Sequence, residues 1–227
     1  VTEVRNFPPE RIICLTEETV ETLYLLGEQD RIVGVTGYAV RPPVVREEKE
    51  RVAAFTSAKI DKILSLQPDL VLVFSDLQAD IAAELIKSGV VVMAYNQRDI
   101  AGILAMIRHL GAIVGVSDKA EELALSFEKR LNDIQLRKKH VDRPRVYFEE
   151  WNSPMITGIK WVSELIEIAG GKDVFFKLSS NEAAADRIVT SQQVINASPN
   201  IIVASWCGKK VRPETFHERR GWSIVPA

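Results

Sequence analysis

Short, continuous apolar runs of strand length constrain this chain more than any other feature. Four of them lie at residues 11–15, 32–35, 70–74 and 90–94. Their hydrophobicity does not alternate, and parallel strands that are buried on both faces require such continuity. Stretches with helical spacing, such as residues 77–87, lie between the runs. This rhythm predicts an α/β lobe whose parallel strands are joined by helical crossovers.

The rhythm stops after residue 98, where two helical patterns follow one another up to about residue 140. The second is predicted to begin at Asp118 and to run to about residue 139, a length of roughly 30 Å. Strand-like runs return at residues 145–148 and 201–204. We therefore expect an α/β fold of two Rossmann-like lobes with parallel sheets, joined by one long backbone helix. The predicted parts are residues 1–98, a helical linker at 99–142, and residues 143–227.

An internal echo supports two lobes. Residues 61–73 and 192–204 both read as a short helix, a proline that ends it, a polar residue and a buried strand. The echo places Asp61 and Gln192 at equivalent positions in the first turn of each helix. General α/β patterning produces the same register, so a true repeat and a coincidence both stay open.

Composition and charge exclude several classes of protein. The 227 residues include 29 Lys and Arg against 31 Asp and Glu, so no general positive field attracts nucleic acid. No apolar run approaches the roughly 18 residues that cross a bilayer. The first residues carry neither an initiating Met nor a signal peptide, and residues 222–227 read as the start of a strand, so we expect a truncated C-terminal lobe.

The two cysteines, Cys14 and Cys207, lie far apart and form no metal-binding pair. The simplest interpretation is two buried, inert thiols. A bridge between them is the alternative, and Cys207, next to Gly208 and Lys209, is also a candidate for a reactive thiol.

Candidate ligand-binding residues follow the carboxyl ends of the predicted strands, where open α/β sheets bind ligands. In the N-terminal lobe they are Tyr38, Arg41, Phe55, Ser75, Asp76 and Gln78. In the C-terminal lobe they are Glu150, Trp151, Lys160, Trp161, Trp206 and Cys207. These three tryptophans, out of four in the chain, are predicted at strand ends or in loops, interleaved with Glu and Lys. That mixture indicates a broad apolar cleft with polar handles.

Signals for catalysis are absent from the sequence. It has no glycine-rich phosphate loop and no nucleophile elbow, and its three histidines lack metal-ligand spacing. Glu149 and Glu150 are adjacent on a predicted strand, so they point to opposite faces and form no catalytic pair. We therefore predict no catalytic residue, no metal site and no resident cofactor.

Several segments, in their order along nearly the whole chain, resemble one family. They are residues 11–15 followed by Thr16 and Glu17, residues 31–36, and residues 68–72. This pattern is similar to the helical-backbone substrate-binding proteins of ABC importers, which bind cobalamin or iron–siderophores. Residues 149–151 and 205–209 look closest to the cobalamin-binding members. The resemblance implies non-catalytic binding of a bulky metal chelate in a cleft between the lobes, with little hinge motion.

The resemblance also implies partners and a location. The family docks on arginines of a transporter permease through one acidic residue on each lobe, and these positions fall on Asp61 and Gln192. Gln192 is neutral, which places docking to a standard permease in doubt. The family's ring of aromatic side chains is matched in part, by Tyr38, Phe55, Trp151 and Trp206.

The expected protein is a monomer in the periplasm or cell envelope, in contact with the membrane only through its transporter. It binds no nucleic acid. A cytoplasmic protein that handles or senses corrinoids is the alternative, and an enzyme on a related two-lobed scaffold is the third possibility.

Overall fold

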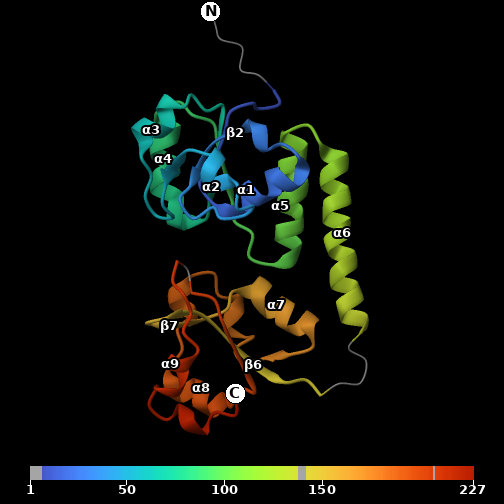
Figure 1. Ribbon diagram of the computed structural model, residues 1–227, viewed down its shortest axis with the longest axis vertical. Coiled ribbons are helices and arrows are strands. Elements are labelled where there is room, and N and C mark those ends of the chain that lie inside the picture. Colours follow the sequence, from blue (N-terminus) through green and yellow to red (C-terminus); the bar gives the residue numbers. More distant parts are fainter. Residues whose placement is uncertain (1–6, 138–141, 207) are drawn as a thin grey trace, which may run out of the picture. The chain divides into compact units, whose positions relative to one another are not determined.

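A computed structural model describes residues 7–137, 142–206 and 208–227 (Figure 1). The chain forms two compact units, which we call unit 1 (residues 1–97 and 102–126) and unit 2 (residues 98–101 and 127–227). Each unit contains one β-sheet with helices packed on it. The predicted α/β class is confirmed. The exact boundaries of the predicted parts stay a prediction.

Unit 1 is built on a five-stranded, fully parallel sheet. Its order is β3 (Arg51–Ala53), β2 (Ile32–Thr36), β1 (Ile12–Cys14), β4 (Leu70–Phe74) and β5 (Val92–Tyr95). Its helices are α1 (Glu17–Leu26), η1 (Gln29–Arg31), α2 (Val45–Glu48), α3 (Ile60–Ser65), η2 (Asp76–Gln78), α4 (Ala79–Lys87) and most of α5 (Ile100–Ile113). The four predicted runs all became strands. The sequence analysis missed β3, because the strand has three residues and only Val52 of them is buried.

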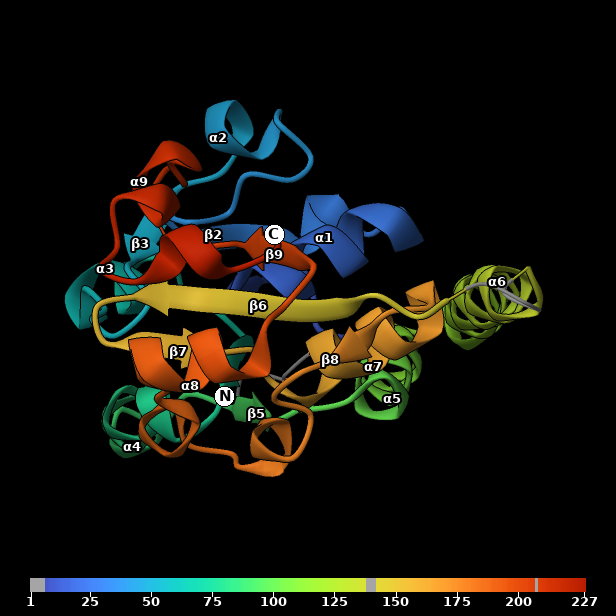
Figure 2. The same cartoon turned by 90° about the horizontal axis from the view of Figure 1, so that it is seen from below.

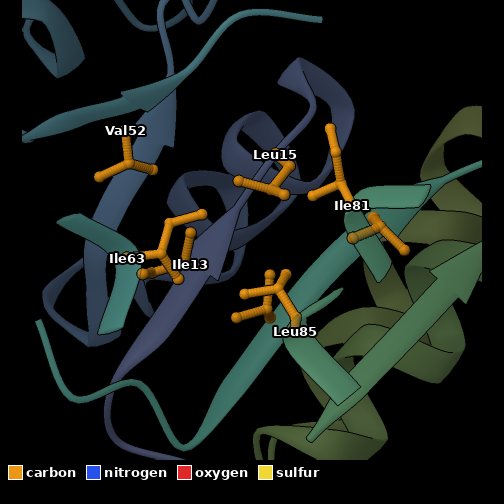
Figure 3. Packing of buried hydrophobic residues seen from close by; sticks show 8 residues of the cluster. Ile13, Leu15, Val52, Ile63, Ile81 and Leu85 are labelled. Atoms are coloured by element: carbon orange, nitrogen blue, oxygen red, sulfur yellow. The ribbon is translucent and has the colours of Figure 1, made fainter. Parts of the chain in front are cut away.

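The core of unit 1 explains why the runs are continuous. Ile13 and Leu15 point to one face of the sheet, where they meet Ile63 of α3 and Leu85 of α4 (Figure 3). Helices α1 and α5 cover the other face (Figures 1 and 2). Cys14 is fully buried and unpaired, and burial raises the pKa of its thiol to about 12. The prediction that Cys14 is a buried thiol is therefore confirmed, and its inertness stays a prediction.

The second predicted helical pattern is α6 (Ser117–Leu136), which begins one residue before Asp118. Residues 138–141, which include the predicted end, lie outside the described part. Helices α5 and α6 approach closely at Gly111, where a Cβ would stand only 2.1 Å from the Cβ of Ala120. Only glycine permits that approach. In the described part of the chain, no helix combines the length and the hydrophobicity needed to cross a membrane.

Unit 2 has a mixed sheet centred on β6 (Arg145–Asn152) (Figure 2). Strand β6 pairs in parallel with β8 (Lys172–Asp173) and β9 (Ile201–Ala204), and antiparallel with β7 (Met155–Thr157). The antiparallel strand was not predicted. It arises because the chain turns back at Ser153 and Pro154, directly after β6.

The helices of unit 2 include one correction. They are α7 (Lys160–Ala169), η3 (Leu178–Ser180), η4 (Ala184–Arg187), α8 (Ser191–Ala197), α9 (Glu214–His217) and η5 (Trp222–Ile224). The strand predicted to start at residue 222 is wrong. Trp222 instead enters the core of unit 2 within a short 3-10 helix, and its indole N–H donates to the Ser191 hydroxyl over 2.6 Å.

The sequence echo corresponds to a repeated clamp in the two units. In unit 1, the main-chain N–H of Arg11 donates to the Asp69 side chain over 3.0 Å, and the Arg11 guanidinium donates to the carbonyls of Leu66 and Gln67. In unit 2, the N–H of Arg145 donates to the Asn200 side chain over 3.0 Å, and its guanidinium donates to the carbonyl of Ser198 over 2.7 Å.

The backbone repeats along with the side chains. Gln67 and Ser198, at equivalent positions before the two prolines, both have a left-handed conformation, with φ of 49° and 47°. Such a conformation is uncommon for residues with a side chain. Its recurrence, together with the two arginine clamps, favours a structural repeat over chance patterning.

A buried ion pair holds the last described segment against β6. Glu149 is 0% exposed, and both of its oxygens accept from Arg219, over 2.6 and 2.8 Å. It also accepts from the Trp206 indole and the Tyr147 hydroxyl, each over 3.0 Å. The guanidinium of Arg219 lies over the rings of Phe216 and Trp222. The pair therefore joins strand β6 to the segment that contains α9 and η5.

We expect Arg219→Met to lower the free energy of unfolding by about 3–5 kcal/mol, because it leaves the buried Glu149 carboxylate without its cation. Arg220→Met is the matched control, since Arg220 is exposed, and it should change the free energy by less than about 0.5 kcal/mol. Urea unfolding of the three proteins measures both. Equal stability of the two variants would contradict a structural role for the pair.

Candidate functional site

The carboxyl end of the sheet in unit 1 presents apolar and aromatic surface. All five strands end at this edge because they are parallel. Tyr38 follows β2 and is 42% exposed, and the half-buried Phe55 follows β3. Val40 and Val44, in the loop after Tyr38, are exposed as well. Exposed apolar side chains that gather at the usual ligand-binding edge of an α/β sheet indicate a contact surface.

Gln78 closes the gap in this edge. The strand order reverses between β1 and β4, which is where small ligands enter many α/β sheets. The Gln78 amide group fills this point, donating to the carbonyls of Leu15 and Phe55 over 3.1 and 2.9 Å and accepting from the Phe74 N–H over 2.9 Å. Gln78 is 1% exposed. The structure therefore gives this predicted ligand contact a bracing position, and the edge it braces is a closed floor.

The other predicted residues of unit 1 lie around this floor. Ser75 has a φ of 56°, a costly conformation for a non-glycine residue, and strain of this kind is often kept at functional sites. Asp76 follows it and is exposed. The Arg41 side chain is 74% exposed and stands 3.3 Å from the Glu21 carboxylate.

Sequence reasoning missed a polar pair at the same edge, Glu18 and Gln97. A carboxylate oxygen of Glu18 accepts from the Thr16 hydroxyl over 2.8 Å and from the Gln97 amide over 3.2 Å. Burial raises the pKa of Glu18. The Gln97 carbonyl oxygen is buried and has no hydrogen-bond partner within the described residues. The sequence of residues 16–19 is typical of a helix start. That interpretation explained these residues without a binding role, so their position beside the reversal point of the strand order was not predicted.

In unit 2, Trp151 lies inside a strand, and the prediction that it follows one is wrong. Strand β6 extends to Asn152 because β7 pairs with its last residues. Glu149 and Glu150 point to opposite faces, as predicted. Glu149 enters the core, whereas Glu150 keeps 35% of its side chain exposed and forms a 2.6 Å ion pair with the buried Arg187.

Three further predicted residues of unit 2 have other partners. Trp206 is only 9% exposed and belongs to the core cluster around Tyr147. The Lys160 ammonium stands 2.8 Å from Asp99, at a polar pocket of about 220 Å³. Trp161 is 36% exposed but lies in the first turn of α7, so its predicted loop position is also wrong. Cys207 lies outside the described residues.

Arg187 was not predicted as a site residue, because nothing in the surrounding sequence indicates that this arginine is buried. It is 2% exposed and also donates to the Thr157 carbonyl over 2.7 Å. Among the residues that the structure describes, no group of three or more His, Cys, Asp or Glu side chains is arranged to hold a metal ion.

Comparison with known proteins identifies relatives of the chain. The vitamin B12-binding protein of Vibrio cholerae is 30% identical over 207 residues, which cover 88% of this chain and 72% of that protein. YvrC of Bacillus subtilis, an uncharacterized ABC transporter substrate-binding lipoprotein, is 27% identical over 235 residues, covering 96% of this chain and 70% of that one.

A solved structure shows the same fold. The crystal structure of the periplasmic vitamin B12-binding protein of Vibrio cholerae superimposes with a TM-score of 0.74 and 26% identity, covering 96% of this chain and 82% of that one. A family model described as periplasmic binding protein matches residues 12–227. The chain therefore belongs to the periplasmic binding protein family and is a binding protein rather than an enzyme.

Proposed function

We propose that this protein binds a bulky metal chelate, with a corrinoid as the first choice, and delivers it to an ABC importer. The exposed aromatic and apolar surface at the carboxyl edge of unit 1, above the floor that Gln78 closes, is the observation that carries this proposal. Because Gln78 fills the gap between β1 and β4, this edge suits a large flat ligand that lies on it better than a small one that must enter between strands.

The relatives support the same class of ligand. Those named above bind vitamin B12 or serve an ABC transporter. A chelate brings its metal already coordinated, so the protein needs apolar area and hydrogen-bonding groups rather than metal ligands. We propose Tyr38 and Phe55 in unit 1, and Trp151 and Glu150 in unit 2, as the principal contacts.

We also propose an extracytoplasmic location, in the periplasm or attached to the cell envelope, and a monomeric state. A named lipoprotein and a periplasmic protein among the relatives support the location. If the protein is free in the periplasm, it contacts the membrane through its transporter.

Substitutions at Trp151 and Trp206 are expected to affect different properties, ligand binding and folding stability respectively. Trp151→Ala should weaken chelate binding by about 1–3 kcal/mol, because it removes an accessible flat apolar surface. Trp206→Ala should instead lower the free energy of unfolding by about 3–5 kcal/mol, because it empties part of the core and leaves Glu149 with one donor fewer. Titration with cobalamin, cobinamide and haem, beside urea unfolding, measures both. No binding of any of these chelates by the wild-type protein would refute the proposed function.

We propose that docking on the transporter uses the first turns of α3 and α8. Asp61 and Gln192 are each the second residue of their helix, and both are exposed. The Gln192 amide donates to the Asn196 side chain over 2.8 Å and carries no charge. An ion pair at a rim mainly sets encounter rate and register. Only one of the two docking positions therefore carries a negative charge.

Gln192→Glu should strengthen association with a permease that carries arginine at both docking loops, and Asp61→Ala should weaken it. Ligand affinity should not change in either variant, because both side chains are exposed on helices and neither is among the proposed ligand contacts. Surface binding to the transporter at low and high salt measures the effect. Identical, salt-independent association of both variants would favour the alternative, a cytoplasmic corrinoid-handling protein that meets no transporter.

A further inference from the structure

We infer that Lys209 and Trp151 form a two-part subsite, in which the ammonium recognises an anionic oxygen group of the ligand, a carboxylate or a phosphate. This inference rests on the proposed function. It adds a requirement on the ligand, since a chelate without such a group loses the contact with Lys209.

The geometry of the pair comes from a tight turn after β9. The Lys209 N–H donates to the Trp206 carbonyl over 3.2 Å, and Gly208 has a φ of 68°, which glycine adopts without strain. The turn brings the Lys209 ammonium to 3.9 Å from the centre of the Trp151 ring. The Trp151 indole N–H is occupied by the Ser153 carbonyl, at 2.9 Å, which fixes the ring under the cation.

The charges around the pair leave Lys209 without an anion. The two carboxylates at this end of β6 are both taken by arginines, Glu149 by Arg219 and Glu150 by Arg187. No salt bridge within the described residues involves Lys209, although its side chain is exposed. An aromatic face holds an exposed ammonium only weakly. An anionic ligand group therefore competes readily for it.

Lys209 also occupies the face of Trp151 on which a flat ligand would stack. At 3.9 Å from the ring centre, the ammonium leaves no space for a second planar group on that side. A ligand that offers an anion draws Lys209 away and uncovers the ring in the same step. A ligand without an anion must displace the cation with no compensating contact.

Two pairs of probes test this exchange, because the members of each pair differ in their anionic group. Cobalamin carries a phosphodiester that cobinamide lacks, and haemin carries two carboxylates that its dimethyl ester lacks. The variants are Lys209→Met and, as the matched control, Lys210→Met, whose lysine is exposed and contacts no ring in the described part. Dissociation constants are measured by calorimetry at low and high salt.

Lys209→Met should weaken binding of the anionic member of at least one pair by about tenfold or more, and should leave or improve binding of the partner that lacks the anionic group. The difference should shrink in high salt, and Lys210→Met should not reproduce it. The pair that shows the effect identifies phosphate or carboxylate as the group. Equal effects on both members of both pairs, with the wild-type protein binding normally, would overturn the inference alone. If the wild-type protein binds none of the four probes, the proposed function fails and the inference fails with it.

Discussion

The arginine clamp that occurs once in each unit is the interaction on which the rest of the structure depends. Arg11 fixes the start of β1 beside β4, and Arg145 fixes the start of β6 beside β9. Each clamp joins three parts of the chain: the end of a helix, the corner before a strand, and the central strand of the sheet. Because it sets the register at the amino ends, it also decides which residues emerge at the carboxyl ends.

The register of the strands determines which side chains lie at the carboxyl edges of the two sheets. In unit 1, the Gln78 amide binds three main-chain groups at the floor, and exposed aromatic and valine side chains follow the neighbouring strands. In unit 2, Arg219 and Arg187 form ion pairs with Glu149 and Glu150 of β6, and Lys209 carries an exposed positive charge over the Trp151 ring. Catalysis would need a nucleophile or a pair of titrating groups, and the family to which the chain belongs is one of binding proteins.

The sequence alone predicted most of the fold, because continuous apolar runs and helical spacing are local signals. It predicted all six strands that contain such a run, the long helix α6 and the equivalent positions of Asp61 and Gln192. It missed β3, β7 and β8, which have two or three residues each and depend on a neighbouring strand for their existence. Trp222 was assigned to a strand for the same reason, since its burial depends on Ser191 and Tyr147, both far away in the sequence.

The candidate site was harder to predict than the fold. Position after a strand selects residues near the edge, and it found Tyr38, Phe55 and Glu150. It does not show which way a side chain points, so it treated Trp206 and Gln78 like their exposed neighbours. The orientation of these two side chains depends mainly on partners that are distant in the sequence. Trp206 donates to Glu149, and Gln78 binds three main-chain groups. The roles of the site residues in ligand binding stay predictions.

Hydrogen exchange with and without a saturating chelate tests most directly the central claim that the carboxyl edges bind the ligand. The probe is whichever of cobalamin and haem binds more tightly. With the chelate bound, we expect slower exchange at residues 37–44, 54–57 and 75–78 in unit 1, and at 150–153 in unit 2. Exchange at the opposite edge, around the clamps at residues 66–69 and 198–200, should not change. Protection that appears at the clamps and is absent from the carboxyl edges would contradict the account.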